Sequence, residues 1–128
     1  MNSLIIPPTP KTPEVLFDAA QGKLIIAGRS IPENALDFFQ PLKNWLMEYS
    51  SHPTQLTILD VKLEYFNTSS SKMLLDLMKV LERLYTEGST VQINWFYEEE
   101  DEDMLEAGED YQAIIRVPFV MVAVDEMF

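Results

Sequence analysis

Five consecutive small polar residues, Asn67-Thr68-Ser69-Ser70-Ser71, are the most distinctive chemical feature of this sequence. They lie between an apolar run and an amphipathic segment, where the first turn of a helix over residues 69–86 is expected. Unpaired backbone N–H groups and the helix dipole favour an anion at that position. A hydroxyl there could accept a phosphate, which adds about −1.5 to −2 charges. The residues alone leave Thr68, Ser69, Ser70 and Ser71 open as acceptors, and simple helix capping is the structural alternative.

Signals for catalysis or cofactor binding are weak in the rest of the chain. His52 is the only histidine and there is no cysteine, so no thiolate or paired-histidine metal site can form. The four glycines are isolated, which leaves no phosphate-binding loop. We therefore expect a protein that is not an enzyme and holds no cofactor or metal. A carboxylate-dependent hydrolase that requires a divalent ion is a minor alternative.

An acidic run from Glu98 to Asp110 contains nine Asp and Glu residues and no Lys or Arg. Carboxylates bind Ca²⁺ and Mg²⁺, but residues 98–103 do not match the ligand spacing of a known calcium loop. A run of like charges is usually a solvated surface. Its functional alternative is a constitutive interaction module in which residues 98–110 dock a basic partner protein.

Length and charge restrict the function further. The 128 residues, 47% of them hydrophobic, suit one domain over residues 14–128, preceded by an extended proline-rich segment over residues 1–13. A formal charge of −12 repels nucleic-acid phosphates and anionic lipids, so neither is expected as a partner. The absence of cysteine and of an export or membrane-spanning stretch predicts a cytoplasmic protein.

The periodicity of apolar residues predicts alternating strands and helices. Two short apolar runs, residues 14–18 and 23–27, indicate a hairpin, and Leu56–Leu63 indicates a central strand. Helices are expected from Ser30–Glu33 onward, with a kink or break at Pro41, and over residues 69–86 with Gly88 closing the second. A strand over 90–97, a short helix near 104–113 and a strand near 116–124 complete the order β-β-α-β-α-β-α-β. We expect an α/β fold whose mixed sheet is covered by helices, with the later strands parallel.

Four segments of the sequence together resemble the SiaC family of bacterial regulatory phosphoproteins. They are Gly28–Ala35, Leu63–Lys72, Ile93–Tyr97 and Asp101–Tyr111, and the resemblance extends from about Thr12 to Phe119. The Asn-Thr-Ser-Ser element and the Ser-x-Pro-Glu-Asn element are its most specific parts. The resemblance implies a single domain similar to the STAS domain of anti-sigma-factor antagonists.

The resemblance also implies a partner-switching function. A cognate serine/threonine kinase would phosphorylate the threonine at the start of the second helix, and a phosphatase of the protein phosphatase 2C type would remove the phosphate. The unphosphorylated form would bind and activate a diguanylate cyclase, which promotes aggregation and biofilm formation through cyclic di-GMP. Carried onto this sequence, the phosphoacceptor is Thr68, surrounded by Asn67, Ser69, Ser70, Ser71 and Lys72.

Overall fold

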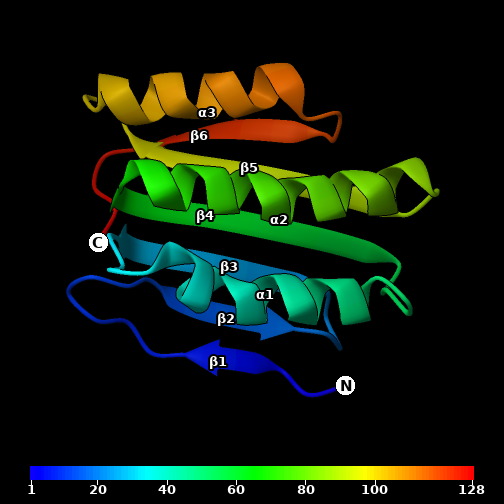
Figure 1. The fold of residues 1–128 in the computed structure, drawn as a ribbon. Helices are drawn as coiled ribbons and strands as arrows, with labels where there is room; N and C mark the ends of the chain where they lie inside the picture. The colour runs from blue at the N-terminus through cyan, green and yellow to red at the C-terminus, as the bar shows by residue number, and fades with distance from the viewer.

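The chain forms one six-stranded sheet and three helices in a computed structural model that describes residues 1–128 (Figure 1). In chain order the elements are β1 Leu4–Ile6, β2 Glu14–Asp18, β3 Lys23–Ser30, α1 Ala35–Tyr49, β4 Leu56–Phe66, α2 Thr68–Thr86, β5 Thr90–Glu98, α3 Glu102–Ile114 and β6 Phe119–Val124.

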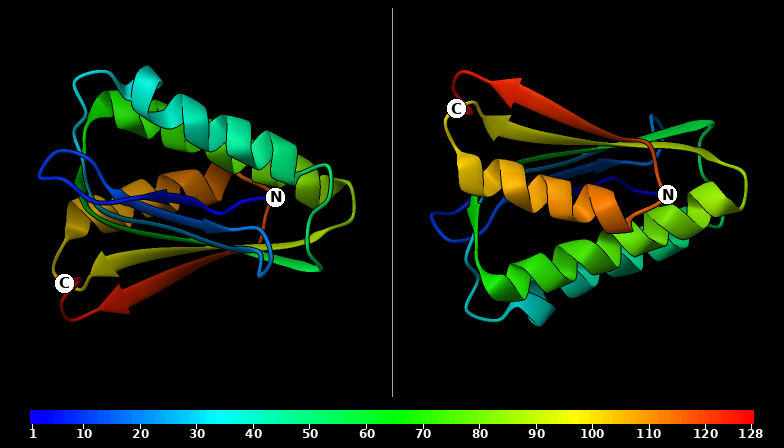
Figure 2. Two further views of the ribbon diagram at one scale, coloured as in Figure 1. Left: turned by 90° about the horizontal axis from the view of Figure 1, so that it is seen from below. Right: turned by 90° about the horizontal axis from the view of Figure 1, so that it is seen from above.

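The strands lie side by side in the same order as in the sequence. β1, β2 and β3 pair antiparallel, whereas β3, β4, β5 and β6 pair parallel. Each connection between parallel strands contains one helix. The three crossovers have the same hand and advance across the sheet in the same direction, so all three helices lie on one face of the sheet (Figure 2). The predicted mixed α/β fold is confirmed, with β4 inside the sheet.

The core lies between this sheet face and the helices, because the strands alternate and the helices are amphipathic. Trp95 on β5 is fully buried and contacts the rings of Phe66, Tyr111 and Phe119. Its indole N–H donates to the Met104 carbonyl of α3 at 3.0 Å. α1 and α2 contribute the fully buried side chains Leu42, Leu46, Leu74, Leu77 and Leu81.

The N-terminal segment differs from the prediction by one strand. Residues 1–13 are expected to be merely extended, but Leu4–Ile6 pairs with β2 as β1, so the predicted order lacks the first strand. Leu4 and Ile6 pack against the hydrophobic core, which explains the pairing. Pro7 and Pro8 follow directly, and proline cannot extend a strand ladder.

The start of α1 also differs from the prediction. α1 begins at Ala35 with Asn34 as its N-cap, whose side-chain oxygen accepts from the Asp37 N–H at 3.1 Å. The predicted start at Ser30–Glu33 is wrong because Ser30 is the last residue of β3 and its hydroxyl is bonded within the core.

Pro41 does not divide α1, so the predicted break between two shorter helices is wrong. Pro41 is exposed, and its lack of an N–H removes one helical hydrogen bond. The burial of apolar residues on both sides of it keeps the helix continuous; these are Phe39, Leu42, Trp45, Leu46 and Tyr49.

The remaining boundaries lie close to the predicted ones. α2 starts one residue earlier than expected, and α3 starts at Glu102 because Asp101 caps it by accepting from the Met104 N–H at 3.0 Å. The last strand starts at Phe119, three residues later than expected, after Pro118.

No helix covers the second face of the sheet (Figure 2). Asp60 on β4 is only 4% exposed there, and its carboxylate pairs with the Lys23 ammonium at 3.0 Å and accepts from the Asn94 amide at 2.9 Å. This polar chain across three strands satisfies the buried carboxylate. None of the helices is long and apolar enough to span a membrane.

Candidate functional site

The hydroxyl-rich segment, residues 67–71, lies where β4 ends and α2 begins (Figure 1). Asn67 has extended backbone angles and caps α2, since its side-chain oxygen accepts from the Ser70 N–H at 2.9 Å. The Asn67 N–H donates to the Ser30 carbonyl at 3.0 Å. The helix start is therefore fixed both by its own cap and by the end of the neighbouring strand β3.

Ser70 is a structural residue of this segment. It is fully buried, and its hydroxyl lies 3.0 Å from the Ser30 carbonyl oxygen and 2.8 Å from the Ser30 hydroxyl. Ser30 is also fully buried. A kinase cannot reach the Ser70 hydroxyl without unfolding the first turn of α2.

Ser71 is half-buried and links α2 to α3. The Tyr111 hydroxyl donates to the Ser71 carbonyl at 2.8 Å and lies 3.1 Å from the Ser71 hydroxyl. Burial raises the pKa of Tyr111 above its ordinary value of 10.0, opposed by the Ser71 hydrogen bond and assisted by the charge of Asp110. Tyr111 therefore stays protonated at neutral pH and holds the two helices together.

Thr68 and Ser69 are the two exposed hydroxyl residues of the segment. The Ser69 hydroxyl donates to the Asn67 side-chain oxygen at 3.2 Å. Thr68 is the first residue of α2, and its hydroxyl makes no hydrogen bond within the protein. Lys72 follows one turn later, is exposed and forms no ion pair. Of the four candidate residues, Thr68 is the one that is both exposed and free of side-chain hydrogen bonds within the protein.

The surface around this helix start is apolar and acidic. Leu36 on α1 is 56% exposed, and with Met73 it lines a groove between α1 and α2. Tyr65, just before α2, is 51% exposed and borders a hollow lined by the carboxylates of Glu64, Asp101 and Asp103. Sequence periodicity assigns Leu36 to the buried face of its helix and therefore does not identify it as a surface residue. Only the structure shows that this side chain is exposed.

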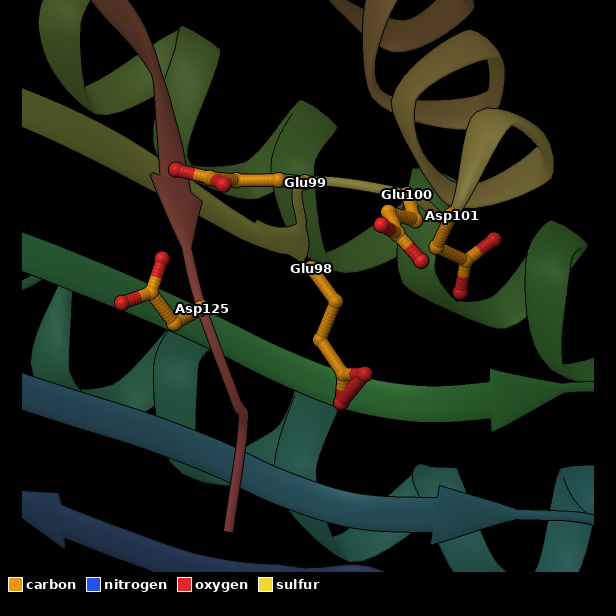
Figure 3. A pocket seen from close by; sticks show the side chains of 5 residues that line it. All are labelled: Glu98, Glu99, Glu100, Asp101 and Asp125. Atoms are coloured by element: carbon orange, nitrogen blue, oxygen red, sulfur yellow. The ribbon is translucent and has the colours of Figure 1, made fainter.

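The acidic run occupies the end of β5, the following turn and α3. At the turn, Glu98, Glu99, Glu100, Asp101 and Asp125 line a hollow of about 480 Å³. Their carboxylates point in different directions instead of toward one centre (Figure 3). No group of three acidic residues or histidines in the structure is arranged to hold a metal ion.

Comparisons with known proteins agree on one family. The model of the SiaC family regulatory phosphoproteins matches residues 6–124. An uncharacterized protein of Pseudomonas aeruginosa strain UCBPP-PA14 is 32% identical over 126 residues, covering 98% of this chain and all of that protein. The crystal structure of apo-SiaC from P. aeruginosa has a TM-score of 0.89 at 31% identity, covering 96% of this chain and all of that one.

A second solved structure contains a partner protein. It is the crystal structure of the diguanylate cyclase SiaD in complex with its activator SiaC, also from P. aeruginosa. The similarity has a TM-score of 0.90 at 31% identity and covers 94% of this chain and 99% of that chain.

Proposed function

The chain belongs to the SiaC family of regulatory phosphoproteins, and from this premise we propose that it is a non-enzymatic switch that activates a diguanylate cyclase. Phosphorylation at Thr68 would turn the switch off, and the unphosphorylated form would bind the cyclase. The complex between the related SiaC and the diguanylate cyclase SiaD supports the choice of effector.

One observation supports Thr68 as the phosphoacceptor. Its hydroxyl is exposed and free of hydrogen bonds at the first position of α2, whereas the hydroxyls of Ser69, Ser70 and Ser71 are engaged. A kinase can transfer a phosphoryl group to Thr68 without disturbing a bond that holds the fold. The Asn67 cap keeps the helix start in place beside it.

A phosphate at this position changes the surface and leaves the fold intact. The dianion is stabilised by the N-terminus of α2, which has no acidic residue in its first turn. The modification therefore does not unfold the helix. Around it lie exposed apolar side chains and the hollow of Glu64, Asp101 and Asp103. Lys72 lies one turn away, and the nearby Arg29 already pairs with Glu64 at 4.0 Å. Burying the dianion under the apolar surface of a partner costs desolvation free energy, so the phosphate weakens a partner that docks by apolar contact.

The other partners follow from the same proposal. A serine/threonine kinase adds the phosphate and a phosphatase of the protein phosphatase 2C type removes it. Both would act in the cytoplasm, where the cyclase makes cyclic di-GMP and thereby promotes biofilm formation. The exposed position of Thr68 suits two enzymes that must reach the same atom.

Intact-mass spectrometry of the protein purified from its own organism tests the proposal. We expect a fraction that carries one phosphoryl group, localised to Thr68 by peptide fragmentation. The group should be absent from Thr68→Ala and present in Ser69→Ala, which removes the neighbouring exposed hydroxyl. Phosphate on another residue, or its persistence in Thr68→Ala, would show the assignment to be wrong.

A further inference from the structure

The outer edge of β6 is an open row of backbone hydrogen-bonding groups. The Ile93 N–H donates to the Pro118 carbonyl and the Glu99 N–H to the Val124 carbonyl, each at 2.9 Å. In a parallel ladder the groups that face the neighbouring strand belong to alternate residues, so Val120 and Val122 also face β5. The N–H and C=O groups of Phe119, Met121 and Ala123 therefore point away from the sheet. We call these groups the β6 edge.

Little in the protein covers the β6 edge. The Gln112 side chain donates to the Phe119 carbonyl at 2.9 Å, and the remaining groups have no partner. The C-terminal residues turn away from it, because the Met127 N–H donates to the Glu98 carboxylate and Phe128 borders a hollow beside Gly28 and Arg29.

The two edges of the sheet are built differently. β1 has three residues and ends at two prolines, features that protect an edge from further pairing. β6 has six residues, all apolar, and contains no charge, proline or bulge. An edge of this kind pairs readily with another extended chain.

The charge around the β6 edge selects the partner. Residues 98–128 contain eleven Asp and Glu residues and one arginine, Arg116. α3 lies beside β6 and contributes five of these acids, while the hollow of Glu98–Asp101 and Asp125 lies at the end where β6 finishes (Figures 1 and 3). A second copy, with its own charge of −12, would be repelled, whereas a basic segment would be attracted.

We propose that the β6 edge binds an extended, apolar segment of another protein as a seventh strand, with lysine or arginine near the end of β6. The strand runs antiparallel, because antiparallel pairing is the more stable per residue. Its first residues then lie beside the acidic hollow. This surface is separate from Thr68, so the proposal does not depend on the phosphorylation switch.

Amide exchange measured by NMR tests the pairing. The probe is a synthetic peptide, acetylated and amidated, of two lysines followed by alternating valine and threonine. Exchange at Met121 and Ala123 should slow at least about threefold on adding it, while Val120 and Val122, already bonded to β5, stay unchanged. A peptide with glutamates in place of the lysines should have no effect. Unchanged exchange, or equal effects of both peptides, would overturn the proposal.

Variants at two places test separately the contribution of backbone hydrogen bonds and the contribution of charge to peptide binding. Ala123→Pro removes one outward N–H and should abolish binding while leaving the sheet bonds intact, whereas Ala123→Val should bind normally. Glu99→Gln combined with Glu100→Gln alters no strand pairing and should weaken lysine-peptide binding at least about threefold. Unweakened binding by Ala123→Pro or by the Gln pair contradicts the proposal. Sedimentation of the free protein as a dimer that Ala123→Pro dissociates would assign the edge to a second copy instead.

Discussion

The hydroxyl oxygens of Ser30 and Ser70 lie 2.8 Å apart inside the protein, although the residues are forty positions apart in the sequence. The contact joins the end of β3 to the first turn of α2, next to the proposed phosphorylation site. The geometry of that site therefore depends on a bond that no local pattern reveals.

Removing this bond should destabilise the fold. Ser70→Ala leaves buried groups of Ser30 without their partner, so we expect the free energy of unfolding to fall by about 1–3 kcal/mol. Ser69→Ala, at an exposed position, should change it by less than about 0.5 kcal/mol. The double variant Ser30→Ala with Ser70→Ala should cost less than the two single changes together. Urea unfolding of the wild type, the three single variants and the double variant measures these differences, and additive costs would contradict a shared bond.

Charge at Thr68 should control binding of the cyclase. Thr68→Ala is expected to bind like the wild type, and Thr68→Asp at least about tenfold more weakly, which corresponds to about 1.4 kcal/mol. Thr86→Asp is the matched control, because it adds the same charge at the exposed far end of α2. Isothermal titration calorimetry with the purified cyclase of the same organism gives the affinities. Equal affinities for Thr68→Ala and Thr68→Asp would exclude the switch.

The space around Gly108 should be too small for even a methyl group. A Cβ atom there would lie 2.4 Å from Trp95 Cδ1 and 2.6 Å from Met121 Cε. Replacing glycine by alanine inside a helix ordinarily stabilises it by about 0.5–1 kcal/mol. For Gly108→Ala we expect the opposite sign, a loss of about 1–3 kcal/mol from overpacking α3 against β5. A thermal or urea melt decides the sign, and a stabilised variant would disprove the close contact.

Stability should decline at alkaline pH through Tyr111. Its pKa is raised in the folded protein, first by burial, so the unfolded chain releases this proton at a lower pH than the folded chain. The contribution is present below the ordinary pKa of 10.0 and is lost as the pH rises through the raised value. Tyr111→Phe should be less stable at pH 7 by about 1 kcal/mol, for the lost hydrogen bonds, but should show a shallower decline above about pH 10. Urea melts across this range test the difference in slope.

The sequence predicts most elements of the fold because their patterns are local. The buried face of α2 and the alternation of Val91, Ile93 and Trp95 follow from spacing alone, and both agree with the observed burial except at Tyr85, which is exposed. The sequence misplaces the start of α1 because Ser30 and Glu33 have the spacing of a helix cap, whereas the Ser30 hydroxyl is bonded to Ser70 on α2. The sequence does not reveal β1 because its three residues stand next to prolines and are stabilised by pairing with β2 and by packing on the core.

At the candidate site, too, local features can be predicted from the sequence, whereas features that depend on distant residues cannot. Hydroxyls at a helix start are visible in the sequence, as is the capping residue Asn67. The choice among Thr68, Ser69, Ser70 and Ser71 depends on burial and on partners from β3 and α3, which are distant in the chain. The resemblance to the SiaC family identifies Thr68 as the phosphoacceptor. The hydroxyl of Thr68, which is free of hydrogen bonds, gives a physical reason for the same choice. Thr68 as the phosphoacceptor stays a prediction.

The strictly sequential strand order has a consequence for the assembly of the sheet. No strand has to insert between two strands that are already paired, because each lies beside the one that precedes it in the chain. A nascent polypeptide, which leaves the ribosome N-terminus first, can therefore extend the sheet one strand at a time. β6 is the last strand to join, and the edge that it leaves open is the growing end of that process.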